Sequence, residues 1–596
     1  MQEDNPEIPH PFAPSTRSTA MRRWRQALLA SAVLIALFMA GAVAIRPDAF
    51  YPGNLLFLAR HYALGQDVPV AIGFLASWLA CLFAASRSPA SGRPSQSVPN
   101  LLNALLAFGL LAMVLGCWWL RETILFDFDL SRDEQMARFD AAILAGGQLF
   151  APVPSEWRTF HEALNTLFIL PVPGHGAWVS NYLPGNAALL ALGSALLPAA
   201  LVAPLLTGIA GLSLWSITAR LWPESAATRS VVLLLFAGSA QVWLTATTTF
   251  AMSAHLACNG VWLALFLRDR PWAHAMAMVT ALLATGLHQP LFHPLFAGPV
   301  LLTTLLQKRY RLFGAYTLAY GAIGLFWLAW PGWVAGLAAS SAAGAGPAIT
   351  AGEPVTFFER LDSILRVPHP TSLWIEAANA LRFVSWQHVL ALPLAILGSC
   401  VAWRRREALP IALAAGILAL FIVMTLLLPL QGHGYGYRYA HGLIPSLCLL
   451  GGYGWNWLEG RKAAPLRAMV LASLASLCIL LPVRVVMAQQ FLAPLAALDG
   501  KVAQAGSDIV VVEDEGLLFG DNLVINRPDL SNRPVRLLAS KLSPRDITRL
   551  CNDHRIAFVD ARQMTEARAL YGHAPLPSPG EHMASLAETA RLHCKP

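Results

Sequence analysis

Thirteen apolar runs divide the first 487 residues of the chain, and polar connections separate them. Each run is near the ~20 residues that an α-helix needs to cross a hydrocarbon layer of ~30 Å, and the eighth is short enough to be tilted or partly re-entrant. The pattern therefore predicts an all-α polytopic membrane protein with about 13 transmembrane helices. The runs lie near residues 24–45, 68–86, 101–119, 199–220, 230–248, 250–267, 272–290, 292–307, 312–330, 387–403, 408–430, 441–458 and 465–487.

The pattern changes after Met487, where hydropathy falls. Residues 508–512 and 556–560 have the composition of buried strands, and residues 544–553 between them have that of a helix. This alternation predicts a small α/β domain. The predicted organisation is an N-terminal tail at 1–23, a transmembrane domain at 24–487 and the α/β domain at 488–596.

Composition supports the membrane assignment, because 56% of the residues are hydrophobic and only 13% are charged. The formal net charge is +8, but the basic residues are scattered between apolar runs, which argues against nucleic acid as a partner. Basic residues in seven successive connections fall on one side of the membrane, and the positive-inside rule makes that side cytoplasmic. The N-terminus is then cytoplasmic, whereas the α/β domain and the long loops at 120–198 and 331–386 lie outside.

The first outer loop contains two predicted helices. Met136, Phe139 and Ile143 repeat at helical spacing, which predicts an amphipathic helix that can lie along the membrane surface. Residues 186–197 are apolar but too short to span the membrane, and we expect a half-buried helix there.

The second outer loop begins with small residues at 338–351 and continues with amphipathic stretches at 357–365 and 373–383. We expect a flexible cover over the outer face. It serves either as a lid over a donor site or as a plain surface loop.

Six of the eight cysteines fall in apolar runs, where we expect them to pack as small apolar side chains. Cys551 and Cys594 lie in the polar tail. A disulfide between them can form if the tail lies outside the cytoplasm.

Residues 126–144 gather acids in a chain that is otherwise short of them: Asp127, Asp129, Asp133, Glu134 and Asp140. An acidic cluster beside a membrane span is costly to dehydrate and is a functional-site candidate. Ser131 and Glu134 have the spacing of a capping box, which explains both as the start of a helix. The capping box does not explain the presence of Asp133. A carboxylate in the first helical turn stays ionised and can act as a general base.

Asp127-Phe128-Asp129 forms a DxD motif. Two carboxylates at this spacing can converge on one divalent cation. The alternative is a chance occurrence, since short acidic spacings are common. A divalent cation is the one cofactor that the sequence suggests.

A stretch rich in glycine and tyrosine at residues 432–441 joins two spans and contains Arg438 between Tyr437 and Tyr439. A guanidinium group pairs well with phosphate, which makes Arg438 a candidate for binding a donor phosphate. The alternative is a simple anchor that reaches water from the end of a span.

His288 and His293 flank an outer turn. They are candidates for hydrogen bonds to a donor head group or for polar gap-filling. They are weaker candidates for a metal pair, because Pro290 and Pro294 disturb the helix that would align them.

The chain resembles the GT-C glycosyltransferases, and within them the branch of protein mannosyltransferases and aminoarabinose transferases. The resemblance lies in Asp133-Glu134 in the first outer loop, the surface helix after it, and the segment Tyr182-Leu183-Pro184-Gly185 before the next span. It extends to the sequences RLWP at 220–223, LHQP at 287–290, YRY at 437–439 and LIP at 443–445.

The resemblance implies an inverting transferase that moves a monosaccharide from a polyprenyl-phosphate donor to a lipid, glycan or protein acceptor. The reaction is expected on the periplasmic side of a bacterial inner membrane, among membrane lipids. The family's catalytic aspartate maps onto Asp133, with Glu134 beside it. Where the aminoarabinose branch has Glu-Lys-Pro-Pro, this chain has Tyr182-Leu183-Pro184-Gly185, so that branch's acceptor and metal are not carried over. Tyr182 becomes a substrate-binding candidate.

Two other functions fit the same outline. A transporter or flippase of a lipid-linked saccharide would need ionisable groups near the bilayer midplane, and the predicted spans hold almost none. A polysaccharide polymerase or ligase would share the outer loops and the arginine. Only the length of the transferred glycan separates it from the monosaccharide transferase.

Overall fold

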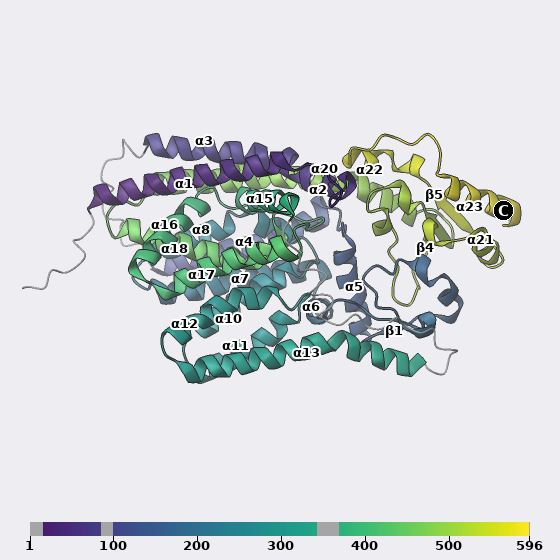
Figure 1. The fold of residues 1–596 in the computed structure, drawn as a ribbon, viewed down its shortest axis with the longest axis horizontal. Helices are drawn as coiled ribbons and strands as arrows, with labels where there is room; N and C mark the ends of the chain where they lie inside the picture. The colour runs from purple at the N-terminus through teal and green to yellow at the C-terminus, as the bar shows by residue number, and fades with distance from the viewer. Residues whose placement is uncertain (1–15, 85–98, 343–368, 595–596) are drawn as a thin grey trace, which may run out of the picture.

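The computed structural model describes residues 16–84, 99–342 and 369–594, and they form a long helical bundle with a smaller tail at one end (Figure 1). Most of the predicted N-terminal tail and the amphipathic stretch at 357–365 lie outside the described residues. Within them, seven helical segments are long and apolar enough to cross a membrane. They are Arg17–Ala44, Gly53–Phe83, Ala104–Ile124, Ala199–Leu221, Tyr310–Ser341, Ala408–Leu427 and Leu466–Ala503.

A helix occupies each of the 13 predicted ranges, although the number that cross the membrane stays a prediction. The range 230–248 is divided between two helices, because Gly238 ends the first and the Ser239 hydroxyl caps the second. The bundle helices are α1 (Arg17–Ala44), α3 (Val68–Ala84), α4 (Pro99–Trp119), α7 (Ala199–Leu221), α8 (Ala226–Ala237), α9 (Ala240–Thr245), α10 (Met252–Phe266), α11 (Pro271–Thr285), α12 (Phe292–Leu306), α13 (Tyr310–Ala342), α15 (Pro370–Ser385), α16 (Ala391–Arg405), α17 (Ala408–Leu427), α18 (Ile444–Glu459), α19 (Leu466–Ala475) and α20 (Leu481–Ala503).

Glycines bring α16 and α18 into close contact within the bundle. A Cβ atom on Gly398 would lie 2.0 Å from the Leu450 carbonyl oxygen, and one on Gly454 would lie 2.3 Å from the Leu394 carbonyl oxygen. Small residues let the backbones of apolar helices approach each other in this way.

The second outer loop differs from the prediction at both ends. The helix expected to stop at Trp330 continues as α13 to Ala342, because Val334 and Ala338 pack against Val172 and Ala177 of the first outer loop. The stretch predicted at 373–383 is α15, a helix as expected. It packs against α1 inside the bundle, however, and does not form a flexible cover.

The first outer loop folds beneath the tail at one end of the bundle (Figure 1). It contains α5 (Arg132–Ala145), the short strands β1 (Ala151–Pro152) and β2 (Ala177–Trp178), and α6 (Gly185–Ser194), which is the expected helix near residues 186–197. The apolar face of α5 was expected on the membrane surface. Met136, Phe139 and Ile143 are instead buried in one cluster with Trp157, Trp178 and tail residues, so protein covers that face.

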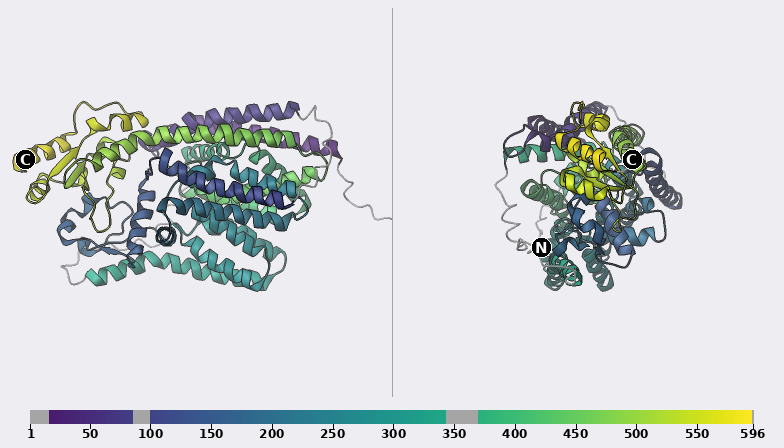
Figure 2. Two further views of the ribbon diagram at one scale, coloured as in Figure 1. Left: turned by 180° about the vertical axis from the view of Figure 1, so that it is seen from behind. Right: turned by 90° about the vertical axis from the view of Figure 1, so that its right-hand side faces the viewer.

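The tail contains a parallel three-stranded sheet in the order β4-β3-β5. Strand β3 (Ile509–Val512), helix α21 (Pro544–Leu550) and strand β5 (Ile556–Val559) lie where the sequence predicts them. Strand β4 (Val535–Leu538) and helices α22 (Thr565–Leu570) and α23 (Glu581–His593) complete it. Figure 2, in the view along the long axis, shows the tail in front of the bundle end.

A disulfide joins Cys551, after α21, to Cys594, after α23. We expect neither thiol to react with a maleimide until a reductant is added, and we expect Cys594→Ser to expose the Cys551 thiol. Closing a loop with a sequence separation of 43 contributes about 4 kcal/mol of stability in the chain-entropy account. Peptide mass spectrometry after alkylation measures the pairing. Alkylation of both cysteines in fresh, unreduced protein would contradict it and would favour a cytoplasmic tail.

Candidate active site

Asp133 lies in the first turn of α5, just after the loop that leaves α4. The helix begins there because Glu134 accepts hydrogen bonds from the backbone N–H groups of Leu130 (3.0 Å) and Ser131 (3.3 Å). Glu134 is buried, and burial together with the charge of Asp129 raises the pKa of Glu134. Glu134 therefore holds the start of the helix, which leaves Asp133 free to face the bundle.

The carboxylate of Asp133 accepts hydrogen bonds from two groups in other parts of the chain. The Nη1 atom of Arg438 donates to Oδ2 at 2.5 Å, and the Tyr182 hydroxyl donates to Oδ1. Burial opposes ionisation of Asp133, but the Arg438 charge, then His288 and the Tyr182 hydroxyl, hold the pKa of Asp133 below its usual range. Asp133 is therefore ionised at neutral pH.

Tyr182 and His288 lie side by side because their two segments pair through the backbone. The Gly185 N–H donates to the Gly286 carbonyl at 2.8 Å, and a Cβ atom on Gly185 would lie 2.6 Å from that oxygen. The Tyr182 and His288 rings consequently lie 4.2 Å apart between centroids, next to Asp133. The sequence singled out both residues, and the structure brings them together.

Arg438 follows a loop whose backbone only glycine adopts easily. Gly432, Gly434 and Gly436 have φ angles of +66°, +154° and +64°. The Arg438 guanidinium is stacked over Phe250 at 5.0 Å and over Tyr439 at 5.3 Å from the ring centroids. The ion pair is largely enclosed, since the side chains of Arg438 and Asp133 are only 10% and 15% exposed.

Arg382 of α15 holds this glycine loop in place. Its Nε atom donates to the Gly436 carbonyl at 2.8 Å, and its Nη2 atom donates to the Gly434 carbonyl at 2.6 Å. Its Nη1 atom pairs with Asp67 at 3.1 Å, and Asp67 also pairs with Arg484 at 2.9 Å. Sequence reasoning missed this buried network. The three residues are far apart in the chain, and no local motif marks them.

Two hollows meet at the Asp133–Arg438 pair. The first is lined by Asp133, Asp140, Tyr182, His288 and apolar side chains that include Phe250 and Met252. The second is lined by Arg438, Tyr439, His255, Asn259 and apolar side chains that include Met252 and Phe292. The ion pair thus lies between two hollows, each lined by both polar and apolar side chains. Asp140 shares the first hollow, and its Oδ2 accepts a hydrogen bond from Ser180 at 2.6 Å.

The remaining substrate-binding candidates lie in different surroundings. Tyr439 lines the second hollow. The Tyr437 hydroxyl instead donates to Glu376 at 3.0 Å, where it braces the glycine loop. The ring nitrogens of His293 lie 2.8 Å from Asn259 and 2.8 Å from the Tyr320 hydroxyl, inside the bundle. These surroundings match the interpretation of His293 as a polar side chain that fills a gap between helices.

The DxD carboxylates are paired with two arginines. Arg121 contacts Asp127 at 2.6 Å and Asp129 at 2.9 Å, and Arg138 contacts them at 2.8 Å and 2.6 Å. A divalent cation at this motif stays a prediction from the sequence. To bind there it would have to displace at least one guanidinium group.

No family model matches the chain, and no curated protein does. Among solved structures, the chain is similar to ArnT from Cupriavidus metallidurans in the apo state, with 13% sequence identity and a TM-score of 0.39. The similarity covers 83% of this chain and 89% of that chain. At this identity and TM-score, function has to be argued from the site.

Proposed function

We propose that the protein is a GT-C-like glycosyltransferase that moves a monosaccharide from a polyprenyl-phosphate donor to a lipid, glycan or protein acceptor. The observation that carries the proposal is the largely enclosed ion pair of Asp133 and Arg438 between two hollows that are lined by polar and apolar side chains. A base and a phosphate-binding cation that touch each other are what transfer from a glycosyl phosphate needs. Apolar side chains of the lining, such as Met252 and Phe292, can contact the lipid part of such a donor.

In the proposed reaction, the Arg438 guanidinium binds the donor phosphate. This draws positive charge away from Asp133, whose carboxylate becomes a stronger base because Arg438 no longer holds its pKa down. Asp133 takes the proton of the acceptor hydroxyl or amine as that nucleophile attacks the anomeric carbon. The bond from the sugar to phosphate oxygen breaks, polyprenyl phosphate leaves on Arg438, and the anomeric configuration inverts.

The aromatic side chains have supporting roles in this scheme. Tyr182 and His288 orient the Asp133 carboxylate and line the space beside it. Tyr439 and Phe250 stack on the Arg438 guanidinium and keep it facing the ion pair. The proposal places this site on the periplasmic side of a bacterial inner membrane, with the N-terminus in the cytoplasm.

The test compares lipids and surface glycans from cells with the gene, without it, and with the gene restored. Loss of the protein should cause a polyprenyl-phosphate sugar to accumulate and one acceptor adduct to disappear, and restoration should reverse both. Transport of the lipid-linked sugar by reconstituted protein, with no bond formed, would overturn the proposal in favour of a flippase. Transfer of long glycans would favour a polymerase or ligase.

The ion pair predicts a shift in pH dependence. A general base must be ionised, so activity falls as the pH drops through the pKa of Asp133. In Arg438→Gln the largest influence that lowers this pKa is removed, whereas the burial that raises it remains. We therefore expect the acidic limb of the kcat/KM profile, which reports the free enzyme, to move to higher pH, and the KM for the donor to rise at least ~10-fold. An unchanged acidic limb in Arg438→Gln would contradict the coupling.

A further inference from the structure

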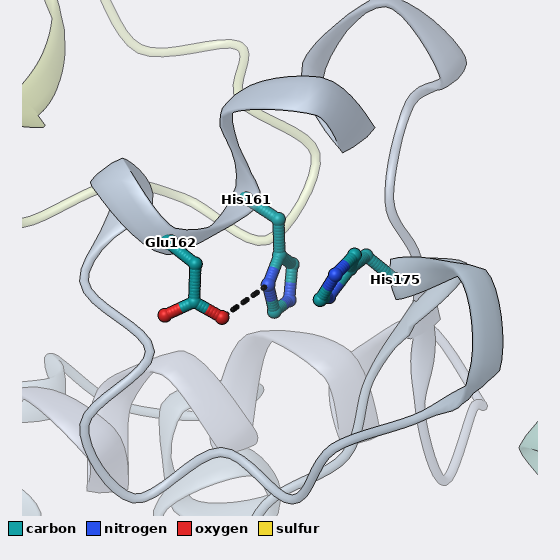
Figure 3. Close-up of side chains that lie close together, drawn as sticks. All are labelled: His161, Glu162 and His175. Carbon is teal, nitrogen blue, oxygen red and sulfur yellow. Dashed lines mark ion pairs between the residues drawn. The ribbon is translucent and has the colours of Figure 1, made fainter. Parts of the chain in front are cut away.

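Three potential metal ligands, His161, Glu162 and His175, lie close together in the first outer loop (Figure 3). His161 and Glu162 belong to the 3₁₀ turn η3 (Ser155–Leu164), and His175 ends the turn η4 (Pro173–His175). One ligand atom from each of the three lies within 4.8 Å of the other two. Two turns that are separated in sequence thus place these three side chains close together.

His161 is buried and His175 is half-buried, and a buried Nδ1 atom of each ring lacks a hydrogen-bond partner among the described residues. His161 is only 5% exposed. The Glu162 carboxylate lies 3.8 Å from the His161 Nδ1 atom, too far for a hydrogen bond. Buried polar atoms are rarely left without a partner in this way, and an ion is one explanation for such a group.

Ring stacking keeps the cluster in place. The His161 ring is stacked on Trp178 at 4.9 Å, and its centroid lies 4.4 Å from that of His175. Glu162 is the adaptable member, with a side chain that is 60% exposed. Ligand atoms around a tetrahedral zinc ion lie about 3.4 Å apart, given Zn–N and Zn–O bonds of about 2.1 Å. The ligand atoms, which now lie within 4.8 Å of one another, must therefore move closer together to bind the ion. Rotation of the Glu162 side chain can supply part of this movement.

We propose that His161, Glu162 and His175 bind a divalent transition metal of the Zn²⁺ class. Two imidazoles and one carboxylate form a donor set that Zn²⁺ accepts, whereas Mg²⁺ and Ca²⁺ prefer oxygen ligands alone. Water fills the fourth position. The site shares no residue with the Asp133 site and does not depend on the proposed sugar transfer.

The metal has a structural role in the outer loop. It joins η3 to η4 at the point where β2 begins, and the Trp178 indole N–H of β2 donates to the Pro528 carbonyl of the tail at 3.0 Å. The chain then runs from β2 to Tyr182. A metal at this position fixes the fold of the loop that carries Tyr182 to Asp133.

The test uses the full-length protein, purified through an affinity tag that lacks histidine and stripped with EDTA. We titrate it with Co²⁺, followed by visible absorption, and with Zn²⁺ in competition. We expect one tight equivalent of metal per chain. We expect His161→Ala and His175→Ala to weaken binding by about 100-fold or more. Glu162→Gln changes an exposed side chain, preserves the fold, and should weaken binding by about 10-fold or more.

Two control variants locate the metal. His593→Ala removes an exposed imidazole of α23 and should bind as the wild type does. The pair Asp127→Asn and Asp129→Asn, made together, should also keep the tight equivalent. The proposal is overturned if the wild type binds no tight equivalent, if Glu162→Gln and both histidine variants bind as the wild type does, or if only the DxD variant loses the metal.

Discussion

Replacing Asp133 by Asn is expected to abolish sugar transfer while leaving the protein folded and inserted in the membrane. The amide has nearly the same shape, but it cannot take a proton from the acceptor. General-base catalysis contributes typically about 10²–10⁴-fold, and we expect kcat to fall by about 10³-fold or more. The measurement is the turnover of donor by purified protein, together with the Tm in the same detergent.

Two isosteric variants serve as controls for this result. Asp553→Asn changes an exposed aspartate of the tail and should keep full activity. Glu134→Gln changes the neighbouring residue, whose carboxylate holds the start of α5, so we expect a loss of stability of about 1 kcal/mol and a much smaller loss of turnover. Full turnover in Asp133→Asn would eliminate it as the base and would direct attention to Asp140, which lines the same hollow.

Replacing Asp67 by Ala is expected to produce the largest loss of stability among single changes in the bundle. Asp67 and Arg484 are both 0% exposed, and Asp67 also pairs with Arg382. Removing the carboxylate leaves two buried guanidinium groups without their counter-ion, which costs about 3–5 kcal/mol. The expected measurement is a fall in Tm by several degrees, with loss of activity because Arg382 holds the loop before Arg438.

Asp48→Ala provides the matched control, because Asp48 bonds Thr371 of the same helix α15 but is 30% exposed. We expect a much smaller fall in Tm than in Asp67→Ala, because the partly exposed carboxylate of Asp48 has little buried charge to balance. Adding Arg484→Met to Asp67→Ala should restore part of the lost Tm, since one unpaired charge is then removed. A wild-type Tm for Asp67→Ala would show that the network does not stabilise the bundle.

The helices were predictable from the sequence because their apolar runs are long and separated by polar connections. What covers an apolar face was not predictable. Met136 and Ile143 of α5 have the spacing of a membrane-surface helix, but protein buries them. Hydrophobic periodicity marks a face that avoids water, and lipid and protein satisfy it equally well. The same limit applies to α13, whose added turns pack on the outer loop.

Asp133 and Arg438 could each be identified from the sequence as candidate site residues, but the contact between them could not be predicted. Asp133 stood out because a capping box explains only its neighbours, and Arg438 stood out among glycines and tyrosines. Their contact joins residues 305 positions apart, which no local pattern records. No local pattern marked Arg382 and Asp67 as partners. Charged residues near the ends of apolar helices are common, and they usually reflect the orientation of the helix in the membrane. His161 and His175 have no regular metal-ligand spacing.

The contact between the tail and α5 can form only late in synthesis, after the ribosome has made the tail. Gln135 of α5 donates to the Asn522 carbonyl at 2.8 Å, and Asn165 donates to the Asp521 carbonyl at 2.7 Å. The first of these bonds spans 387 residues. At about 5–20 residues per second, a ribosome needs roughly 20–80 s to add that stretch. During this interval the tail residues that complete the cover over the apolar face of α5 do not yet exist, so that face stays partly open until the last fifth of the chain is made.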